Sequence, residues 1–252
     1  MLTLEQAVTL QNTYKANEKY RLPLRNTTIV AAVGATAVGK NFLMEKSGLP
    51  VVGTLTTREQ RESDDPARYR YTSLPEMLGK IERGEVIQYG AHPPHIYASE
   101  LQDYTLDAPN VSDIYYHSVG ELENKGFKSV KAISILTSKE QWMSQLWERF
   151  EGINLGAIHA RLDEARQSLR WTRSQVLGVH ATNHLVIINT AYSCVEVGAN
   201  GEDEINSIES NVSRIRDFAN GVYVDPPDDE TVRQYAEGME QAIKIVQSRL
   251  IS

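Results

Sequence analysis

Cysteine and long apolar runs are scarce in this sequence of 252 residues. The single cysteine, Cys194, cannot form an intramolecular disulfide, and no Cys/His cluster has the spacing of metal ligands. We therefore expect a reducing, cytoplasmic setting. No run of about eighteen apolar residues occurs, and residues 1–5 lack the basic start of a targeting segment, so no membrane association is expected.

An excess of positive charge is also missing. Acidic residues number 33 against 26 lysines and arginines, a formal net charge of -7. This balance argues against nucleic acid or an anionic membrane as a partner held by bulk electrostatics. Any phosphate site must then be a local positive cluster. The length and the 41% hydrophobic content fit one sizeable α/β core with an appended lobe.

The order of apolar segments predicts a doubly wound α/β fold. A β-branched run at 28–33 leads into a glycine-rich turn, and residues 41–46 resume with helix-compatible side chains. Longer helical patterns separate the later apolar runs, which is typical of a parallel sheet covered on both faces. These further predicted strands are 51–55, 111–115, 130–136 and 184–189.

The segment from about 56 to 100 is charged, rich in tyrosine, and predicts an inserted substrate lobe with a helix at 75–83 and a strand at 86–91. Residues 4–20 predict an N-terminal helix outside the core. Residues 138–171 predict a long helical stretch with a hinge at 152–156, and two further helices are expected after 206, separated at 223–229.

The turn between the first strand and its helix has the spacing of a phosphate loop. Its glycines permit a tight turn, its backbone N–H groups can point at phosphate oxygens, and a lysine can reach the terminal phosphates. An ordinary glycine turn is the alternative. Asn41 stands where Ser or Thr usually binds Mg²⁺, and its carboxamide oxygen can still ligate the cation. The predicted nucleotide-binding residues are Gly34, Ala35, Thr36, Ala37, Val38, Gly39, Lys40 and Asn41.

Two arginines, Arg58 and Arg61, follow Thr56 and Thr57. Their spacing forms a pair suited to a dianionic phosphate, and nearby tyrosine hydroxyls could complete the set of donors. A solvated surface loop is the alternative explanation for such a charged run.

The order of these motifs resembles the guanylate kinase family of nucleoside monophosphate kinases. The shared motifs, in order, are the phosphate loop, Thr56-Thr57-Arg58-x-x-Arg61, Tyr69-Arg70-Tyr71, Gly84 to Gln88, Tyr97-Ala98-Ser99, Asp113-Ile114, Ala160-Arg161-Leu162 and Val186 to Asn189. The resemblance implies a three-layer P-loop kinase fold with a central parallel sheet, a small inserted mixed β/α acceptor lobe, a helical lid and extra helices at both termini. The implied segments are an extension at 1–27, the kinase-like domain at 28–205 with its lobe at 56–100 and lid at 146–158, and an extension at 206–252.

Family roles carry over residue by residue. The resemblance implies that Lys40 binds donor phosphates, that Arg149 is a lid arginine, that Arg161 spans donor and acceptor, and that Asn189 lies near the adenine of ATP. Asp113 would organise Mg²⁺ together with Asn41. The family's second lid arginine has no counterpart, and the lid is about three residues short. The implied acceptor ligands are Thr54, Arg58, Arg61, Tyr69, Gln88, Tyr97 and Ser99.

Departures from the family concern the positions that read the base. Gln88 replaces a glutamate, and Tyr115 replaces the second aspartate of Asp-Ile-Asp. A carboxylate accepts two donors, whereas a carboxamide offers one donor and one acceptor, so Gln88 matches the paired N–H edge of guanine less well.

These features predict a phosphotransferase that uses ATP and Mg²⁺ to phosphorylate a nucleoside monophosphate, with GMP or dGMP as the default acceptor. A related kinase acting on another acceptor, such as a ribose bisphosphate, is an alternative suggested by Gln88 and Tyr115. A catalytically impaired nucleotide-binding or protein-binding module is another, suggested by Asn41, Tyr115 and the short lid.

Overall fold

A computed structural model describes residues 2–62, 64–176, 183–190 and 201–251. Cys194 lies outside these residues. Contacts divide the chain into two compact units. Unit 1 comprises residues 1–31 and 49–131, and unit 2 comprises residues 32–48 and 132–252. The division passes within strands β1 (Thr28–Val33) and β7 (Ser129–Leu136).

The central sheet confirms the predicted α/β fold. Its strand order is β6-β1-β7-β8, where β6 is Pro109–Asp113 and β8 is His184–Ile188. Strands β7 and β8 pair in parallel, with Ala132 opposite His184. All six residues of β1 are buried. A strand that is buried on both faces explains why β1 is a continuous apolar run without alternation.

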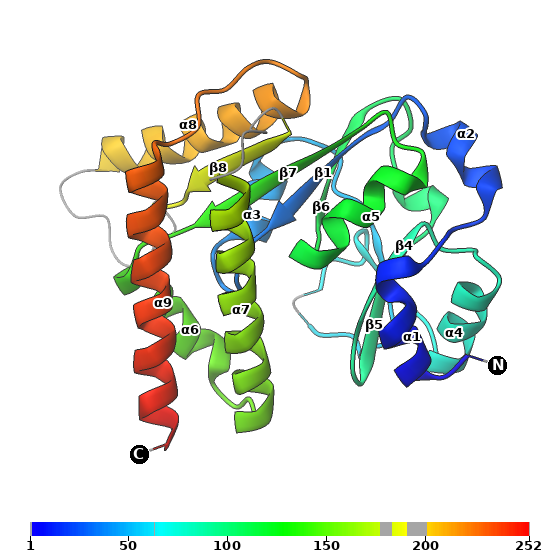
Figure 1. The fold of residues 1–252 in the computed structure, drawn as a ribbon, viewed down its shortest axis with the longest axis horizontal. Coiled ribbons are helices and arrows are strands. Elements are labelled where there is room, and N and C mark those ends of the chain that lie inside the picture. Colours follow the sequence, from blue (N-terminus) through cyan, green and yellow to red (C-terminus); the bar gives the residue numbers. More distant parts are fainter. Residues whose placement is uncertain (1, 63, 177–182, 191–200, 252) are drawn as a thin grey trace. The chain divides into compact units, whose positions relative to one another are not determined.

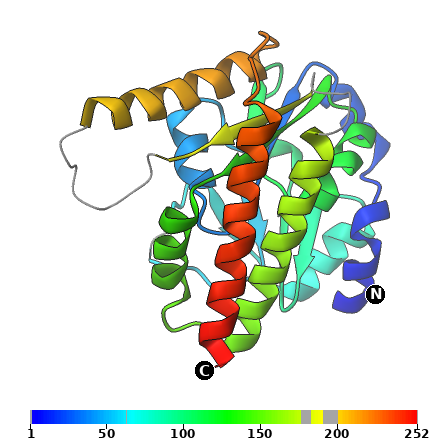
Figure 2. The same cartoon turned by 60° about the vertical axis from the view of Figure 1, so that its left-hand side comes forward.

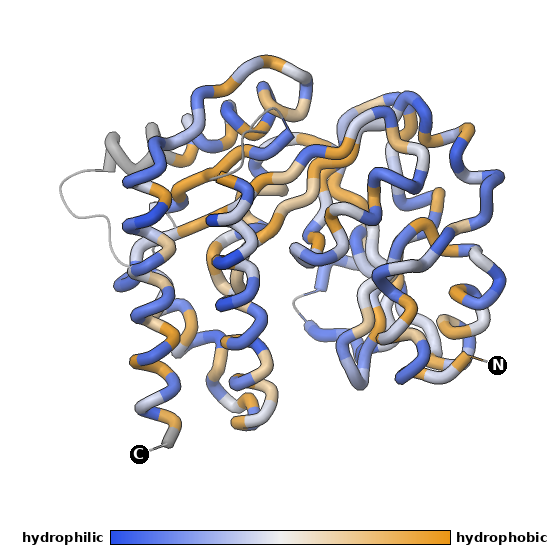
Figure 3. The backbone as a smooth tube through the Cα atoms, viewed as in Figure 1, coloured by the Kyte–Doolittle hydropathy of each residue, from blue (hydrophilic) through white to orange (hydrophobic). Residues whose placement is uncertain are grey.

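Helices of unit 2 cover β8 on both sides. Helix α8 (Gly201–Ala219) contacts β8 and α3 (Lys40–Lys46), while α7 (Leu155–Val176) and α9 (Asp229–Ile251) lie side by side on the other side of β8 (Figures 1 and 2). Helix α6 (Lys139–Phe150) also contacts α9. Hydrophobic and hydrophilic residues alternate along α9 (Figure 3), as expected of a helix with one buried face.

The break between α6 and α7 lies where the glycines predict it. Helix α6 begins at Ser138, whose hydroxyl accepts from the N–H of Gln141 (3.3 Å), and the chain turns at Gly152 with φ 72°. The Asn154 side chain then accepts from the N–H of Ala157 (2.9 Å) at the start of α7. These capping residues satisfy N–H groups that lack partners within the helix.

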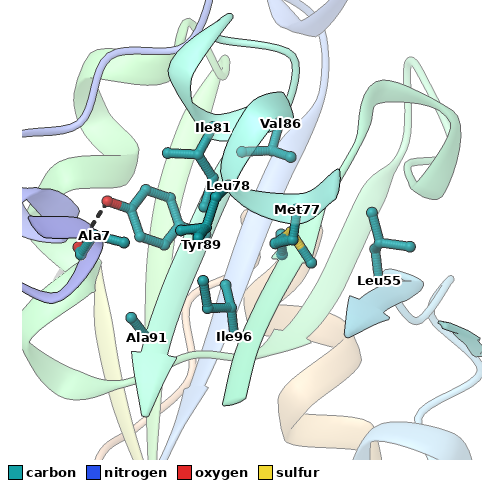
Figure 4. Packing of buried hydrophobic residues seen from close by; sticks show 10 residues of the cluster. Ala7, Leu55, Met77, Leu78, Ile81, Val86, Tyr89, Ala91 and Ile96 are labelled. Atoms are coloured by element: carbon teal, nitrogen blue, oxygen red, sulfur yellow. Dashed lines mark hydrogen bonds between the residues drawn. The ribbon is translucent and has the colours of Figure 1, made fainter. Parts of the chain in front are cut away.

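Unit 1 contains the second sheet, with order β3-β2-β5-β4. Strands β2 and β3 are parallel, whereas β5 runs antiparallel to both β2 and β4. The bounds are Thr54–Thr56 for β2, Tyr69–Tyr71 for β3, Gln88–His92 for β4 and His95–Ser99 for β5. One face of this mixed sheet packs on α4 (Leu74–Glu82), and Figure 4 shows the resulting cluster of Leu55, Met77, Leu78, Ile81, Val86, Tyr89, Ala91 and Ile96. The inserted mixed lobe of the predicted fold is therefore confirmed.

The remaining elements of unit 1 are short helical segments. They are α2 (Arg21–Leu24) and α5 (Val119–Leu122), and the 3₁₀ helices η1 (Gln11–Thr13), η2 (Glu18–Tyr20), η3 (Leu101–Asp103), η4 (Tyr116–Ser118) and η5 (Glu123–Lys125).

Two predictions about strands and helices need correction. Residues 51–55 do not form one strand of the parallel sheet, since Val51 makes only an isolated bridge to Val111 and β2 begins at Thr54 in the mixed sheet. At Gly53 a Cβ would lie 2.8 Å from Asp103 Oδ1. The absence of a side chain at Gly53 therefore lets the chain pass close to Asp103 in η3 before it enters the mixed sheet at Thr54.

Residues 4–20 do not form one helix outside the core. Helix α1 ends at Leu10 and is followed by η1. Ala7 is fully buried in the cluster, its carbonyl accepts from the Tyr89 hydroxyl (2.8 Å; Figure 4), and Tyr14 OH donates to the Val86 carbonyl (2.7 Å). The N-terminal segment is thus part of the lobe's core. The predicted segment boundaries stay predictions.

None of the helices in the described ranges is long and apolar enough to cross a membrane.

Candidate functional site

The predicted phosphate loop joins β1 to α3 in unit 2. Ala37 and Gly39 adopt positive φ values of 64° and 86°. A Cβ on Gly34 would lie 2.9 Å from the carbonyl oxygen of Ile135, so only glycine fits against β7 there. Left-handed backbone at a residue other than glycine costs about 1–3 kcal/mol and is found preferentially at functional sites.

Side chains bind four carbonyl oxygens of this loop. Lys40 Nζ donates to the carbonyls of Gly34 (2.7 Å) and Ala35 (3.0 Å). The indole N–H of Trp142, in α6, donates to the carbonyl of Thr36 (2.8 Å). Asn189 Nδ2, just after β8, donates to the carbonyl of Val38 (2.9 Å).

The planarity of the trans peptide fixes the direction of the loop's amides. Because N–H and C=O of one peptide unit point in opposite directions, amides that follow the four bound carbonyls point away from the side chains that bind these carbonyls. The carbonyl side of these peptide units is thus occupied by protein donors, and the N–H side is the one on which successive loop amides could bind an anion. The amides concerned are those of Ala35, Thr36, Ala37 and Gly39.

Asn189 is fully buried, and its Oδ1 atom has no hydrogen-bond partner among the described residues. An unpaired buried acceptor costs about 1–3 kcal/mol. This atom could accept a hydrogen bond from a ligand amine, such as the exocyclic amine of adenine.

The two predicted arginines of unit 2 lie on the helical hairpin. Arg149 is exposed near the C-terminal end of α6, and Arg161 is half-buried on α7. The hairpin is fixed to α9: Arg173 of α7 pairs with Glu240 (3.6 Å), and Arg166 donates to Gln247 Oε1 (2.9 Å).

In unit 1, strand pairing brings most predicted acceptor ligands to one face of the mixed sheet. Gln88 is opposite Ser99, Thr56 is opposite Tyr97, and Thr54 is opposite Tyr69. Since side chains alternate along a strand, this is the face opposite the hydrophobic cluster. The strand register thus places side chains up to 45 residues apart in the sequence, from Thr54 to Ser99, on the same face of the sheet.

Arg58 follows β2 at this polar face and is 6% exposed. Both terminal nitrogens donate to Asp64, at 2.6 Å each, and the guanidinium lies 4.8 Å from the ring centre of Tyr69. Asp64 also accepts from the Tyr71 hydroxyl (2.6 Å) and the Arg61 N–H (2.8 Å). The hydrogen bond from Arg58 holds the pKa of the Asp64 carboxyl well below its ordinary range, and Asp64 raises the pKa of Arg58.

Arg58, the first of the two arginines predicted to bind phosphate, is thus already paired with the Asp64 carboxylate of the same protein. The Arg61 side chain is exposed. Sequence reasoning missed Asp64, Tyr71 and Trp142 as site residues. The only available signal for Asp64 was its place in the charged run after Arg58, where a surface loop was the competing explanation.

A small pocket of about 40 Å³ opens on the polar face. It is lined by predicted residues of the mixed sheet and by the end of β6, where Asp113 is exposed. Ser99, at the pocket wall, shares a 2.7 Å hydrogen bond with the buried Tyr104 hydroxyl. The lining of the small pocket includes Thr54, Gln88, Gly90, Tyr97, Ser99, Asp113 and Tyr115.

A wider hollow of about 600 Å³ in unit 1 contains none of the predicted site residues. Its wall includes Glu100, whose carboxylate is paired with Lys80 (2.8 Å) and Arg70 (2.7 Å). The polar face is therefore the better candidate for an acceptor site.

No protein-family model matches the chain, and no curated protein matches its sequence. Among solved structures, a guanylate kinase from Anaplasma phagocytophilum is similar to it, with a TM-score of 0.45 and 14% sequence identity. The match covers 77% of this chain and 84% of that chain. Neither an activity nor a substrate follows from a similarity this distant.

Proposed function

We propose that the protein transfers the γ-phosphoryl group of ATP to a nucleoside monophosphate, with GMP or dGMP as the default acceptor. The observation that carries this proposal is the phosphate loop, where Ala37 and Gly39 adopt positive φ and the backbone carbonyls are bound by Lys40, Trp142 and Asn189. The guanylate-kinase-like order of motifs supports the choice of reaction. The single cysteine supports a cytoplasmic setting.

The donor nucleotide fits the residues of unit 2. Loop amides would bind the phosphates, and the Lys40 ammonium would leave the carbonyls of Gly34 and Ala35 to join them. The Asn189 Oδ1 atom, which has no partner among the described residues, would accept a hydrogen bond from the adenine amine. Arg149 and Arg161 carry positive charge on the hairpin that would close over the phosphates, excluding water and suppressing hydrolysis of ATP.

The acceptor fits the residues of unit 1. Arg61 and the hydroxyls of Tyr69 and Tyr97 would bind the acceptor phosphate, with the Arg58–Asp64 pair fixing the loop that carries Arg61. Thr54, Gln88 and Ser99 would line the pocket for the rest of the acceptor. The acceptor's phosphate oxygen attacks the γ-phosphorus of ATP as the bond to ADP breaks, so no covalent enzyme intermediate is needed.

Asn41 and Asp113 are the residues that would hold Mg²⁺. No cluster of three or more His, Cys, Asp and Glu residues that could hold a metal occurs within the described part of the chain. An amide, one carboxylate, phosphate oxygens and water are a set that Mg²⁺ accepts. When bound, the cation would offset charge on the phosphates.

Coupled measurement of ADP release tests the reaction with ATP, Mg²⁺ and a panel of GMP, dGMP, AMP, CMP, UMP, dTMP and ribose phosphates. We expect turnover with at least one nucleoside monophosphate. Lys40→Ala should lower kcat by at least about a hundredfold, because removing one donor to developing charge costs about 3 kcal/mol. Lys46→Ala removes an exposed cation from the same helix and should change kcat by less than about twofold.

ATP binding without turnover of any acceptor would refute the kinase and favour a nucleotide-binding module. Turnover of ribose phosphates alone would favour the related kinase on another acceptor, which the small pocket would suit. Absence of ATP binding would refute both.

A further inference from the structure

Tyr115 closes one side of the acceptor pocket at a position where Gly90 has no side chain. A Cβ on Gly90 would lie 3.1 Å and 3.2 Å from two ring carbons of Tyr115. The ring therefore packs directly on the backbone of β4. Gly90 is two residues from Gln88, so both lie on the polar face of the mixed sheet.

Two histidines hold the Tyr115 ring. The His92 ring lies 3.8 Å from it between centres, at an interplanar angle of 31°. The His117 ring is nearly parallel to it, at 4° and 5.8 Å. Together these three aromatic rings form what we call the Tyr115 stack, which runs from β4 to η4.

The N-terminal segment fixes the far end of the Tyr115 stack. His117 Nδ1 shares a 3.1 Å hydrogen bond with Asn12 Oδ1, in η1. The neighbouring Gln11 accepts from the N–H of Ala91 in β4 (2.8 Å). Helix η1 thus binds His117 at one end of the stack and the backbone beside His92 at the other, and movement of Tyr115 would break its ring contacts with both histidines.

The pocket that remains is small. A buried water needs about 10–15 Å³ on this measure, so 40 Å³ holds about three waters. A base of either kind is larger than this, and the two fused rings of a purine exceed the space by more than the single ring of a pyrimidine, so a purine requires the larger displacement of Tyr115.

Hydrogen bonding to Gln88 is compatible with a pyrimidine. Gln88 offers one donor and one acceptor. Uracil and thymine present a matching N–H and C=O, and cytosine presents an amine and a ring nitrogen. Adenine, through its amine and a ring nitrogen, and guanine, through N1–H and O6, also present one donor and one acceptor, so only the size of the pocket separates the purines from the pyrimidines.

We propose that Tyr115, held in the stack with His92 and His117, restricts the acceptor to a pyrimidine nucleoside monophosphate. This inference rests on the proposed kinase function and replaces its default acceptor. Tyr115 sets specificity by filling space, and Gln88 pairs with the ring edge.

The test compares kcat/KM for UMP, dTMP and CMP with that for GMP and AMP in the full-length protein. Wild type should prefer its best pyrimidine by at least tenfold. Tyr115→Ala should lower this preference at least tenfold, by raising kcat/KM for purines. Tyr115→Leu keeps most of the volume and should retain the preference. Tyr223→Ala removes a tyrosine that is 81% exposed and should behave as wild type.

A wild type that turns over GMP or AMP as well as any pyrimidine would overturn the inference and leave the kinase standing. The same holds if Tyr115→Ala is folded, active and unchanged in preference. Turnover of ribose phosphates alone would overturn both this inference and the nucleoside monophosphate kinase, in favour of the related kinase on another acceptor. If Tyr115→Ala does not fold, the inference is tested by the preference of wild type for pyrimidines and by whether Tyr115→Leu retains that preference. Lack of turnover with every acceptor would overturn the proposed function itself, and this inference with it.

Discussion

At the scale of single residues, the phosphate loop depends on side chains from elements far away in the sequence. Trp142 and Asn189 each bind a loop carbonyl, and a hydrogen bond of this kind contributes about 1 kcal/mol. Both residues are fully buried, so they also pack in the core of unit 2. The loop's shape is thus coupled to the folding of that unit.

A buried hydrogen-bond chain in the same unit contains a titratable group. The Thr172 hydroxyl donates to Ser134 Oγ (2.9 Å), and Ser134 in turn lies 2.9 Å from His184 Nε2. Ser134 therefore links a buried hydroxyl to the imidazole, and the burial of that imidazole disfavours its charged form. Burial lowers the pKa of His184 from 6.5 to about 4.

We predict that protonation of His184 destabilises the fold. Its folded pKa lies below the unfolded value, so its contribution is fully present above pH 6.5 and is lost as pH falls toward 4. Each pKa unit is worth about 1.4 kcal/mol, so the loss approaches about 3 kcal/mol. Urea unfolding at pH 7.5 and 4.5 measures it.

Carboxylates also titrate in this range, so His184→Gln is the reference. Its free energy of unfolding should fall less between the two pH values than that of wild type, by about 2–3 kcal/mol. Equal pH dependence in both proteins would contradict the assignment of the proton to His184.

At the scale of elements, local signals predicted helices better than the placement of strands. The glycine break between α6 and α7 and the two C-terminal helices follow from capping residues, glycines and prolines, which act over a few residues. By contrast, an apolar run such as 51–55 does not say which sheet it joins. Where this segment changes sheets, Gly53 lies close to Asp103, 50 residues away, and such a contact is invisible in a local pattern.

Several candidate residues share this limit. The sequence alone predicted Lys40 and its glycine loop, because the motif is contiguous. The pairing of Arg58 with Asp64 and the bond from Trp142 to Thr36 depend on tertiary structure, and no spacing rule indicates them. Tyr115 was noted as a departure from the family, but its contact with Gly90 required strand β4 to be in place.

Helix α9 provides a prediction about an element. Met239 and Ile243 are fully buried, and α9 contacts both α6 and α7. We expect Met239→Ala to lower the free energy of unfolding by about 2–4 kcal/mol, because it leaves a cavity among α6, α7 and α9. Denaturant unfolding monitored by circular dichroism measures the change.

Glu237→Ala, on the exposed side of the same helix, should change stability by less than about 0.5 kcal/mol. If Met239→Ala were as mild as this control, α9 would be an appendage and would not support the hairpin that carries Arg149 and Arg161.

At the scale of the whole molecule, the candidate donor and acceptor residues belong to different compact units. The phosphate loop, Asn189 and both hairpin arginines lie in unit 2, and the polar face with Asp113 lies in unit 1. We predict that each ligand protects its own unit from amide hydrogen exchange. ATP should slow exchange in residues 34–42, and a nucleoside monophosphate alone should slow exchange in β2, β4 and β5.

The expected size of this protection from exchange follows from the linkage between ligand binding and stability. A ligand at a hundred times its Kd stabilises the state that binds it by about 2.7 kcal/mol, so amides that exchange by opening of that unit should slow by up to about a hundredfold. Amide exchange of the protein is measured by mass spectrometry with ATP alone, with the acceptor alone and with both ligands. Comparison of these samples shows which unit each ligand protects. In Lys40→Ala the ATP effect should disappear while the acceptor effect persists, since Lys40 is in unit 2 only. Protection of residues 88–99 by ATP alone, or an unchanged ATP effect in Lys40→Ala, would contradict this division of the site.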